Sequence, residues 1–416
     1  MKKILVLTIL LSTAFSLSAA PTAEDTLAFY KTQVRSFSEK MSAQDKALAQ
    51  TLADNLGTWI TQFSEYKQVP EALLLQTQLY LKADNAGAAL VPLFRLQKLY
   101  APAQLPQDIL EQALQGLHRN ARETARSNFM LKNANSNATP EEKEADALYV
   151  FSKLYGKDFY QPAAEAFENF FVRFPEYEQN DKVELWYGDL HRVNGNYLAA
   201  IAQCQKVFQL YPDTPYRAAS MRLTGDIYAD MKDTEKAMSA YAKVLREFPQ
   251  SSERGIVFKH MGMLEENNKQ YDTALMDYNK AIELLGTSDA AYEAYYGKAD
   301  VYKKTKSFEE AYDTLQQTAN LFRKDPYKYV TALTDAAAIA KRNLKDEGKY
   351  VQSLEKALIA YPKNSRSAEI MYDLAAVYEK RGQNQKAVDM YHRLILQHPT
   401  DKLANKAQTR LSRLEK

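Results

Sequence analysis

The residues best suited to metal binding or nucleophilic catalysis in this 416-residue sequence are five histidines and one cysteine. No two histidines lie four residues apart with an acid between them, the arrangement that binds zinc on a helix. His392 and His398 are six residues apart and fall on different faces of a helix. There is also no glycine-rich phosphate loop, no Gly-x-Ser-x-Gly turn and no calcium loop of alternating acids. The remaining histidines are His118, His191 and His260.

The single cysteine, Cys204, has no second cysteine with which to form an intramolecular disulfide. It stands at a position of the repeat described below that is otherwise aromatic, and we predict that it is a small buried residue. Adjacent acids such as Glu265 and Glu266 are typical of solvated helix surfaces. The sequence therefore predicts no catalytic residue, no metal and no cofactor, and hence a protein that is not an enzyme.

The strongest pattern in the chain is a repeat of 37 residues. Alanines recur at this step, and Pro175, Pro212 and Pro249 recur at the same step. A fixed period of 20 to 50 residues is typical of proteins built from stacked structural repeats. The alanines are Ala163, Ala200, Ala237, Ala274 and Ala311.

One unit, between Tyr211 and Pro249, shows what each repeat contains. Apolar and small residues near Gly225 and Tyr228 follow helical spacing, and a second amphipathic segment carries Ala237. The closing proline cannot continue a helix. The pattern predicts a helix, a short turn, a second helix and a stop.

This pattern resembles the tetratricopeptide repeat, in which small residues lie where the two helices meet and aromatic residues fill the space beside them. The resemblance implies an all-α fold, a superhelical solenoid of antiparallel helix hairpins. We expect about eight repeat-like units. The unit that ends at Pro362 is degenerate, because Tyr350 stands at the usual alanine position, and Gly286 replaces a closing proline.

The repeat register extends upstream, because Ala89 lies 74 residues before Ala163. We predict an N-terminal helical or degenerate repeat region at 21–132 and a C-terminal solenoid at 141–416. The polar segment 133–140 between them is a loop or a hinge. Leu27 begins a short run with helical spacing, and Ser42 is placed to cap a helix that ends near Tyr66. These helices either cap the solenoid or self-associate as a short coiled coil.

Residues 1–20 have the features of a secretory signal peptide. Lys2 and Lys3 precede an apolar run that ends in Ser18, Ala19 and Ala20. The run is shorter than the roughly 20 apolar residues of a membrane span, and no later segment reaches that length. We expect cleavage, no integral membrane segment after signal removal, and a periplasmic or secreted location without a lipidated cysteine.

The charge balance argues against a nucleic-acid partner. The chain has 54 basic and 52 acidic residues, and removal of the two lysines near its start leaves the signs equal. Proteins that bind nucleic acids usually concentrate lysine and arginine on one face.

In solenoids of this type, the first helices of successive hairpins line a concave groove that holds a peptide or a partner helix. Aspartates recur there at one repeat position, as Asp189, Asp226 and Asp300, which indicates either a binding pattern or simple helical pairing, such as that of Asp226 with Arg222. The resemblance implies these groove residues: Asp189, Arg192, Arg222, Asp226, Asp230, Lys259, Glu266, Tyr296, Asp300, Lys303, Arg342 and Tyr372.

The acids in this set disfavour a clamp for a C-terminal carboxylate. A ligand with basic and apolar side chains fits better, through ion pairs with the aspartates and cation–π contacts with Tyr296 and Tyr372. Loss of these side chains is then expected to weaken binding.

The 37-residue step and its connectors are similar to the repeats of bacterial YbgF-like and BamD-like envelope proteins. This resemblance implies a periplasmic adaptor that binds an envelope protein or a peptide segment. The alternative is a protein that binds cell-wall polysaccharide and supports an envelope enzyme or export system, for which the neighbouring Tyr292, Tyr295 and Tyr296 are candidates. The sequence does not predict the oligomeric state.

Overall fold

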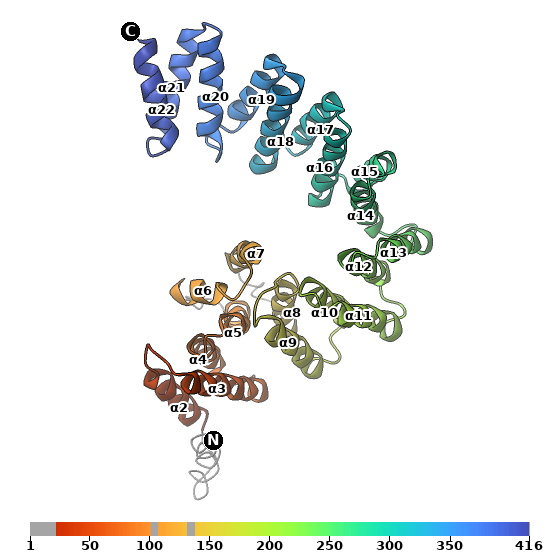
Figure 1. Ribbon diagram of the computed structural model, residues 1–416. Helices are drawn as coiled ribbons and strands as arrows, with labels where there is room; N and C mark the ends of the chain where they lie inside the picture. The colour runs from red at the N-terminus through yellow and green to blue at the C-terminus, as the bar shows by residue number, and fades with distance from the viewer. Residues whose placement is uncertain (1–21, 101–106, 131–137, 416) are drawn as a thin grey trace, which may run out of the picture. The chain divides into compact units, whose positions relative to one another are not determined.

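The computed structural model describes residues 22–100, 107–130 and 138–415 (Figure 1). Every regular element among them is a helix, which confirms the predicted all-α class. The predicted signal peptide lies outside the described residues, as does most of the polar segment 133–140. The chain divides into two compact units, residues 1–233 and 234–416, and each is described by itself. The boundaries predicted from the sequence remain a prediction.

Unit 1 is a series of helices. Its helices are α2 (Ala23–Ser36), α3 (Ala43–Gln62), α4 (Val69–Lys82), α5 (Ala86–Leu99), α6 (Gln107–Leu114), α7 (Arg119–Met130), α8 (Pro140–Phe151), α9 (Tyr160–Arg173), α10 (Asn180–Val193), α11 (Tyr197–Leu210) and α12 (Arg217–Asp230).

Unit 2 continues the pattern. Its helices are α13 (Thr234–Glu247), α14 (Glu253–Asn267), α15 (Tyr271–Leu285), α16 (Asp289–Lys304), α17 (Phe308–Leu321), α18 (Pro326–Ile339), the π-helical segment η1 (Ala340–Leu344), α19 (Glu347–Ala360), α20 (Ser367–Lys380), α21 (Asn384–Gln397) and α22 (Lys402–Leu414).

The turn between the two helices of a repeat has one backbone geometry that recurs along the chain. A residue with positive φ ends the first helix, and the amide of the next residue donates to a carbonyl five positions back, as from Gln270 to Glu265 at 2.8 Å. This is the Schellman arrangement, which favours glycine. The positive-φ residues of the turns with this bond are Asp84, Gly195, Lys232, Lys269, Lys306 and Gly382. Asp158 and Lys345 also have positive φ at this repeat position, but there the next amide donates to Gly156 and to Ala340, three and six positions back.

The spacing of these turns explains the degenerate unit. Lys306 and Lys345 are 39 residues apart, whereas Lys345 and Gly382 are again 37 apart. The two extra residues are accommodated where α18 continues into η1. Tyr350 therefore retains the repeat position of Ala311, and both side chains are buried.

Close approach between helices explains the small residues. The five periodic alanines are all fully buried. In the hairpin of α14 and α15, the ring of Tyr278 lies between two glycines: a Cβ on Gly262 would be 3.1 Å from the ring, and a Cβ on Gly297 of α16 only 2.3 Å. Tyr278 thus packs two successive first helices together, and larger residues at these glycines would force them apart.

The N-terminal helices close the core of unit 1. Ser42 caps α3 through the amide of Asp45, as the sequence predicts, although α3 ends at Gln62. Leu27 and Tyr30 of α2 are buried in the same core as α3 and α4. This packing favours the capping alternative.

The α6–α7 hairpin lies beside α5 (Figure 1), and its attachment depends on three glycines. A Cβ on Gly116 would be 2.1 Å from the amide nitrogen of Gly87, and a Cβ on Gly156 would be 2.3 Å from the carbonyl oxygen of Gly116. Three turns therefore meet here at backbone contact distance.

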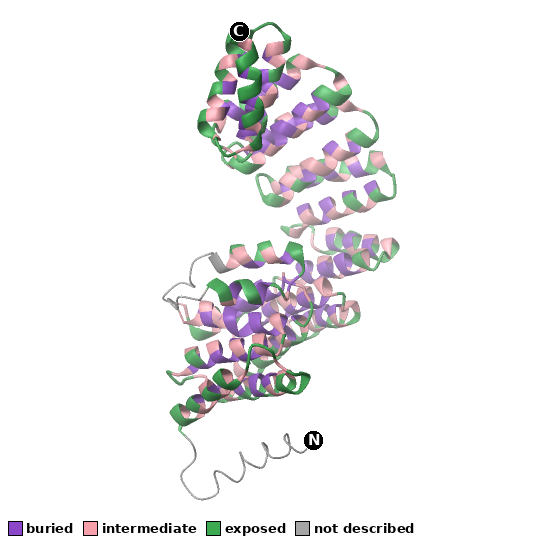
Figure 2. Cartoon of the chain, turned by 60° about the vertical axis from the view of Figure 1, so that its left-hand side comes forward, coloured by how far each residue is buried: buried purple, intermediate pink, exposed green. Residues whose placement is uncertain are grey.

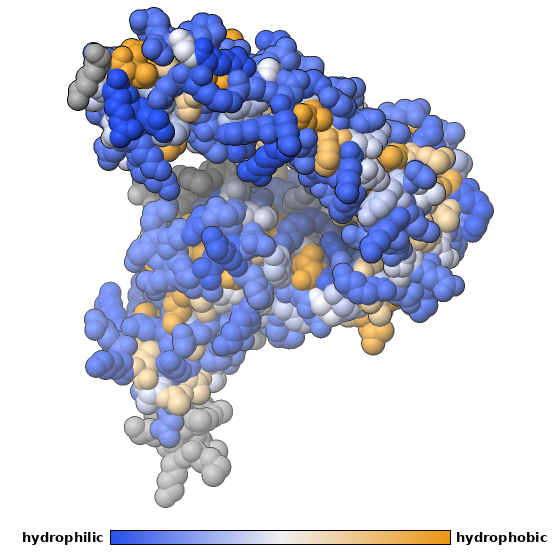
Figure 3. Space-filling model, turned by 45° about the horizontal axis from the view of Figure 1, so that its top comes forward, coloured by the Kyte–Doolittle hydropathy of each residue, from blue (hydrophilic) through white to orange (hydrophobic). Residues whose placement is uncertain are grey.

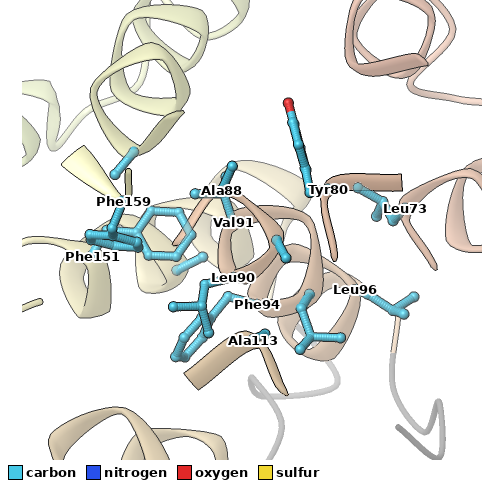
Figure 4. Close-up of a cluster of buried hydrophobic side chains, with 14 of the residues drawn as sticks. Leu73, Tyr80, Ala88, Leu90, Val91, Phe94, Leu96, Ala113, Phe151 and Phe159 are labelled. Carbon is cyan, nitrogen blue, oxygen red and sulfur yellow. The ribbon is translucent and has the colours of Figure 1, made fainter. Parts of the chain in front are cut away.

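Buried side chains form stripes along the helices of both units, while the outer turns are exposed (Figure 2). In unit 1 the core centres on α5, where Phe94 packs edge-on against Phe151 with ring centroids 5.6 Å apart (Figure 4). On the surface, apolar residues occur as separate small patches among polar ones (Figure 3). None of the described helices has the length and apolar character of a membrane span.

Candidate functional site on the first helices

The predicted groove residues all lie on the first helices of their repeats or directly after one. In unit 1, α10 carries Asp189 and Arg192, and α12 carries Arg222, Asp226 and Asp230. In unit 2, α14 carries Lys259 and Glu266, α16 carries Tyr296, Asp300 and Lys303, η1 carries Arg342, and α20 carries Tyr372. We call these two surfaces the first-helix faces of unit 1 and unit 2.

On the first-helix face of unit 1, charged residues form a ladder from one repeat to the next. Lys153, in the turn directly after α8, pairs with Asp189, and Arg192 bonds both Asp189, at 3.1 Å, and Asp230, at 2.8 Å. Burial opposes the charge of Arg192, but the surrounding aspartates outweigh it and raise its pKa. The ladder therefore holds α8, α10 and α12 together by fixed, opposite charges.

Arg222 and Asp226 form an ion pair between helical neighbours four residues apart. Both side chains are largely buried. Together with the pair of Asp189 and Arg192, this geometry matches the simple helical pairing considered above. A role of these residues in binding remains a prediction.

An aromatic ledge lies beside the ladder, formed by Tyr149 of α8 and Trp186 of α10. Their ring centroids are 5.1 Å apart, and the Tyr149 residue is 45% exposed. Lys153 lies 5.5 Å from the centre of the tyrosine ring, and Lys182 lies 5.1 Å from the tryptophan ring. Tyr149 and Trp186 are 37 residues apart, a signal that the sequence contained but that the groove prediction missed.

In unit 2, two predicted groove residues are buried between repeats. Lys259 is 8% exposed and donates to Glu293 of the next first helix at 2.5 Å. Glu266 is 9% exposed and accepts hydrogen bonds from the Tyr278 hydroxyl, at 2.6 Å, and from Lys304, at 2.7 Å. Their charges are balanced within the fold.

Two of the three tyrosines considered for polysaccharide binding, Tyr292 and Tyr296, are also packed. Tyr292 and Tyr296 lie with ring centroids 4.7 Å apart, and the Tyr296 hydroxyl donates to Asp335 of α18 at 3.1 Å. Burial, followed by the effect of Tyr292, raises the pKa of Tyr296 strongly. Tyr296 therefore joins α16 to α18 as a neutral hydrogen-bond donor.

Asp300 and Lys303 form an ion pair at 2.6 Å, and Lys304 bonds the same carboxylate at 3.1 Å. Burial opposes the charge of Asp300, but the two lysines hold its pKa below the usual value. About two fifths of each side chain in this cluster is exposed, so a ligand can reach it.

Arg342 and Tyr372 occupy different environments. Arg342 is exposed on η1. The ring of Tyr372 is partly buried against Tyr391 of the same hairpin, with centroids 5.8 Å apart. Near Arg342, a cavity of about 390 Å³ is lined by Lys341, Lys345, Glu347, Tyr350, Asp373, Ala376, Val377 and Lys380.

Two of the residues considered for other chemistry, Cys204 and His191, are buried and structural. Cys204 is 2% exposed, as predicted, and burial raises the pKa of its thiol to about 11. Burial lowers the pKa of His191 to about 4, and its ring nitrogen Nδ1 lies 2.9 Å from the Tyr160 hydroxyl. Among the described residues, no group of three histidine, cysteine or acidic side chains could hold a metal ion.

Hairpins stacked in series with partly exposed first-helix faces define a helical repeat protein, a class that acts by presenting surfaces to other molecules. Three models of the tetratricopeptide repeat match the chain, at residues 182–247, 292–324 and 369–401. The chain therefore contains tetratricopeptide repeats, and repeats of this type are scaffolds for protein–protein interactions. No curated protein matches its sequence.

Solved structures with similar folds include two repeat proteins of bacteria. A tetratricopeptide repeat protein from Parabacteroides merdae is 16% identical, with 66% of this chain and 99% of that chain covered and a TM-score of 0.35. The C-terminal part of a repeat-containing protein from Cytophaga hutchinsonii is also 16% identical, with 63% and 97% covered and a TM-score of 0.44. Identities this low carry no functional argument.

Proposed function

We propose that this protein is an exported scaffold of the bacterial cell envelope that holds a partner protein or peptide segment on its first-helix faces. The observation that carries the proposal is the aromatic ledge of Tyr149 and Trp186. Aromatic side chains flanked by charged ones are typical of the energetic centres of protein interfaces. The neighbouring ladder supplies charges of both signs at fixed positions.

Export is supported by the sequence of residues 1–20, with two lysines, an apolar run and a small-residue end. The similarity of the 37-residue units to YbgF-like and BamD-like repeats supports an envelope role. Residues 1–30 fused to alkaline phosphatase, which is active only after export, are expected to give activity in a Gram-negative host. The same fusion with an arginine in the apolar run, Leu7→Arg, is the control and should give none; equal activity would argue against export.

The binding surface is tested by affinity capture from envelope extracts of the native organism. We expect the intact protein to capture one defined protein, and the Tyr149→Ala, Trp186→Ala variant to lose it. Leu198 is 80% exposed and lies on α11, a second helix of unit 1, so Leu198→Ala is the matched control and should retain the partner. Capture that the ledge variant leaves unchanged would exclude this surface.

Glycan binding is the second candidate, because an exposed aromatic ring such as that of Tyr149 can also stack on a sugar. The two lysines over the ledge weigh against it, since they occupy the ring faces that a pyranose would need. Purified native protein is expected to show no ledge-dependent binding to peptidoglycan in a sedimentation assay. Loss of sedimentation in the ledge variant alone would favour the glycan instead.

A further inference from the structure

Unit 1 also contains a polar groove away from the first-helix faces. It has a volume of about 780 Å³ and lies between α3 and α9, with α4 and α5 beneath. Both α5 and α9 are second helices of their hairpins. None of the predicted groove residues lines it.

The two walls of this groove are matching polar faces. From α3 come Gln50, Asp54 and Thr58, at steps of four residues and therefore on one face. From α9 come Glu165 and Asn169, again four residues apart. Asp54 and Glu165 place a carboxylate on each wall.

Polar side chains of α4 also line the floor of the groove. Gly57 lies inside the 20-residue helix α3, where glycine is unfavourable by about 1 kcal/mol relative to alanine. A Cβ at Gly57 would be 2.5 Å from Nε2 of Gln76, and this amide donates to the carbonyl of Ala53 at 3.2 Å. Tyr80 points out of the apolar core (Figure 4), and its hydroxyl donates to Asp54 at 3.0 Å.

The groove has an excess of negative charge. Asp54 accepts hydrogen bonds from Gln50 and Tyr80, and Glu165 accepts one from Gln161, so each carboxylate contacts neutral donors. Arg95 is the only cationic side chain among the described residues that line the groove, and it already pairs with Glu144 at 2.9 Å.

A carboxylate from each wall affects the pKa of Tyr80, which lies on the floor of the groove. Burial is the main cause of the raised pKa of Tyr80, and the charges of Asp54 and Glu165 raise it further. A cation between the walls would interact favourably with both carboxylates.

We propose that this groove binds an extended peptide segment that carries a lysine or arginine side chain. Side-chain amides such as those of Gln50, Gln161 and Asn169 can donate and accept, and so match the main chain of an extended peptide. The carboxylates of Asp54 and Glu165, which accept from neutral donors, select a cationic side chain, which a neutral glycan lacks. The site is independent of the first-helix faces and gives the scaffold a second binding surface.

The test begins with selection of random linear 12-residue peptides, displayed on phage, against the full chain. The most enriched peptide is then synthesised with fluorescein, and its affinity is measured by fluorescence anisotropy. The variant Asp54→Asn, Glu165→Gln removes both charges but keeps an acceptor for the Tyr80 hydroxyl. Asp146→Asn, Glu176→Gln removes the same charge at exposed positions of unit 1 outside the groove. Circular dichroism verifies that both variants fold.

We expect the selected peptides to be enriched in lysine or arginine. We also expect binding to weaken about tenfold or more in the groove variant, to stay unchanged in the control, and to fall with added salt. Recovery of no peptide, enrichment without basic residues, or equal affinity for both variants would overturn the proposal. Competition of the bound peptide by neutral chitotetraose would overturn it as well, in favour of a glycan site.

Discussion

Two acidic side chains in the α14–α15 hairpin make the stability of unit 2 depend on pH. Burial and mutual repulsion raise the pKa of Glu265 to about 7, and burial raises that of Asp277 to about 6. Each carboxyl group has one buried oxygen without a hydrogen-bond partner. The side chain of Thr273 faces Glu265 and lowers its pKa, and no lysine or arginine contributes to either shift.

The sign of the pH dependence follows from proton binding. Unfolded, the two groups titrate near 4.5 and 3.8, so between about pH 4 and pH 7 the folded state holds more protons. The free energy of unfolding must therefore fall as pH rises through this window. The cost of ionising these two carboxyl groups in the folded state is absent below about pH 4 and is fully present above about pH 7.

We expect Asp277→Asn to stabilise the protein at pH 8. The side-chain amide is neutral at this pH, so it avoids the cost of a buried charge and can still donate a hydrogen bond to Glu265. The shift at Asp277 alone corresponds to about 3 kcal/mol at about 1.4 kcal/mol per pKa unit. Because the group is only half-buried, solvent screening reduces this to an expected gain of about 1.5 kcal/mol. The gain should vanish near pH 4.

Urea unfolding monitored by circular dichroism between pH 4 and pH 8.5 measures this effect as a shift of the midpoint. Asp272→Asn, an exposed acid in the first turn of α15, is the control. Loss of its favourable interaction with the helix N-terminus should destabilise slightly. A native midpoint that rises from pH 5 to pH 8, or an Asp277→Asn variant no more stable than the native protein at pH 8, would show that ionisation of these two carboxyl groups does not destabilise unit 2.

Three further substitutions test the packing. Gly297→Ala places a Cβ 2.3 Å from the ring of Tyr278 and should destabilise unit 2 by about 1–3 kcal/mol in urea unfolding; an unchanged midpoint would contradict the proposed packing. Lys269→Gly relieves a positive φ of 62° and should stabilise by about 1 kcal/mol, and a loss of stability would contradict the strain argument. In Gly116→Ala, the new Cβ would clash with the backbone of Gly87. Amide hydrogen exchange should therefore become faster across α5 to α8, while unit 2 stays protected. Unchanged exchange in unit 1 would show that the turns can separate without cost.

The repeat architecture could be predicted from the sequence because each unit encodes its own hairpin. The periodic alanines, the cap at Ser42 and the burial of Cys204 depend on neighbours within one or two helices. The π-helical segment η1 was not predicted, because it appears in the sequence only as a repeat two residues too long.

The use of individual side chains was harder to predict. Repeat register places Glu266 on a first helix, but only the structure shows that Lys304, one repeat later, neutralises its charge. The carboxylates of Asp54 and Glu165 are 111 residues apart and meet across one groove through the packing of α3, α5 and α9. No local pattern contains that information.

Binding of a partner protein to the first-helix face of unit 1 can be measured by site-specific photo-cross-linking in living cells. A photoreactive phenylalanine analogue replaces Tyr149 on α8 or, as control, Leu198 on α11, which is 80% exposed. We expect one discrete cross-linked protein from position 149 and none from position 198. The same products from both positions, or none from position 149, would contradict binding at this face.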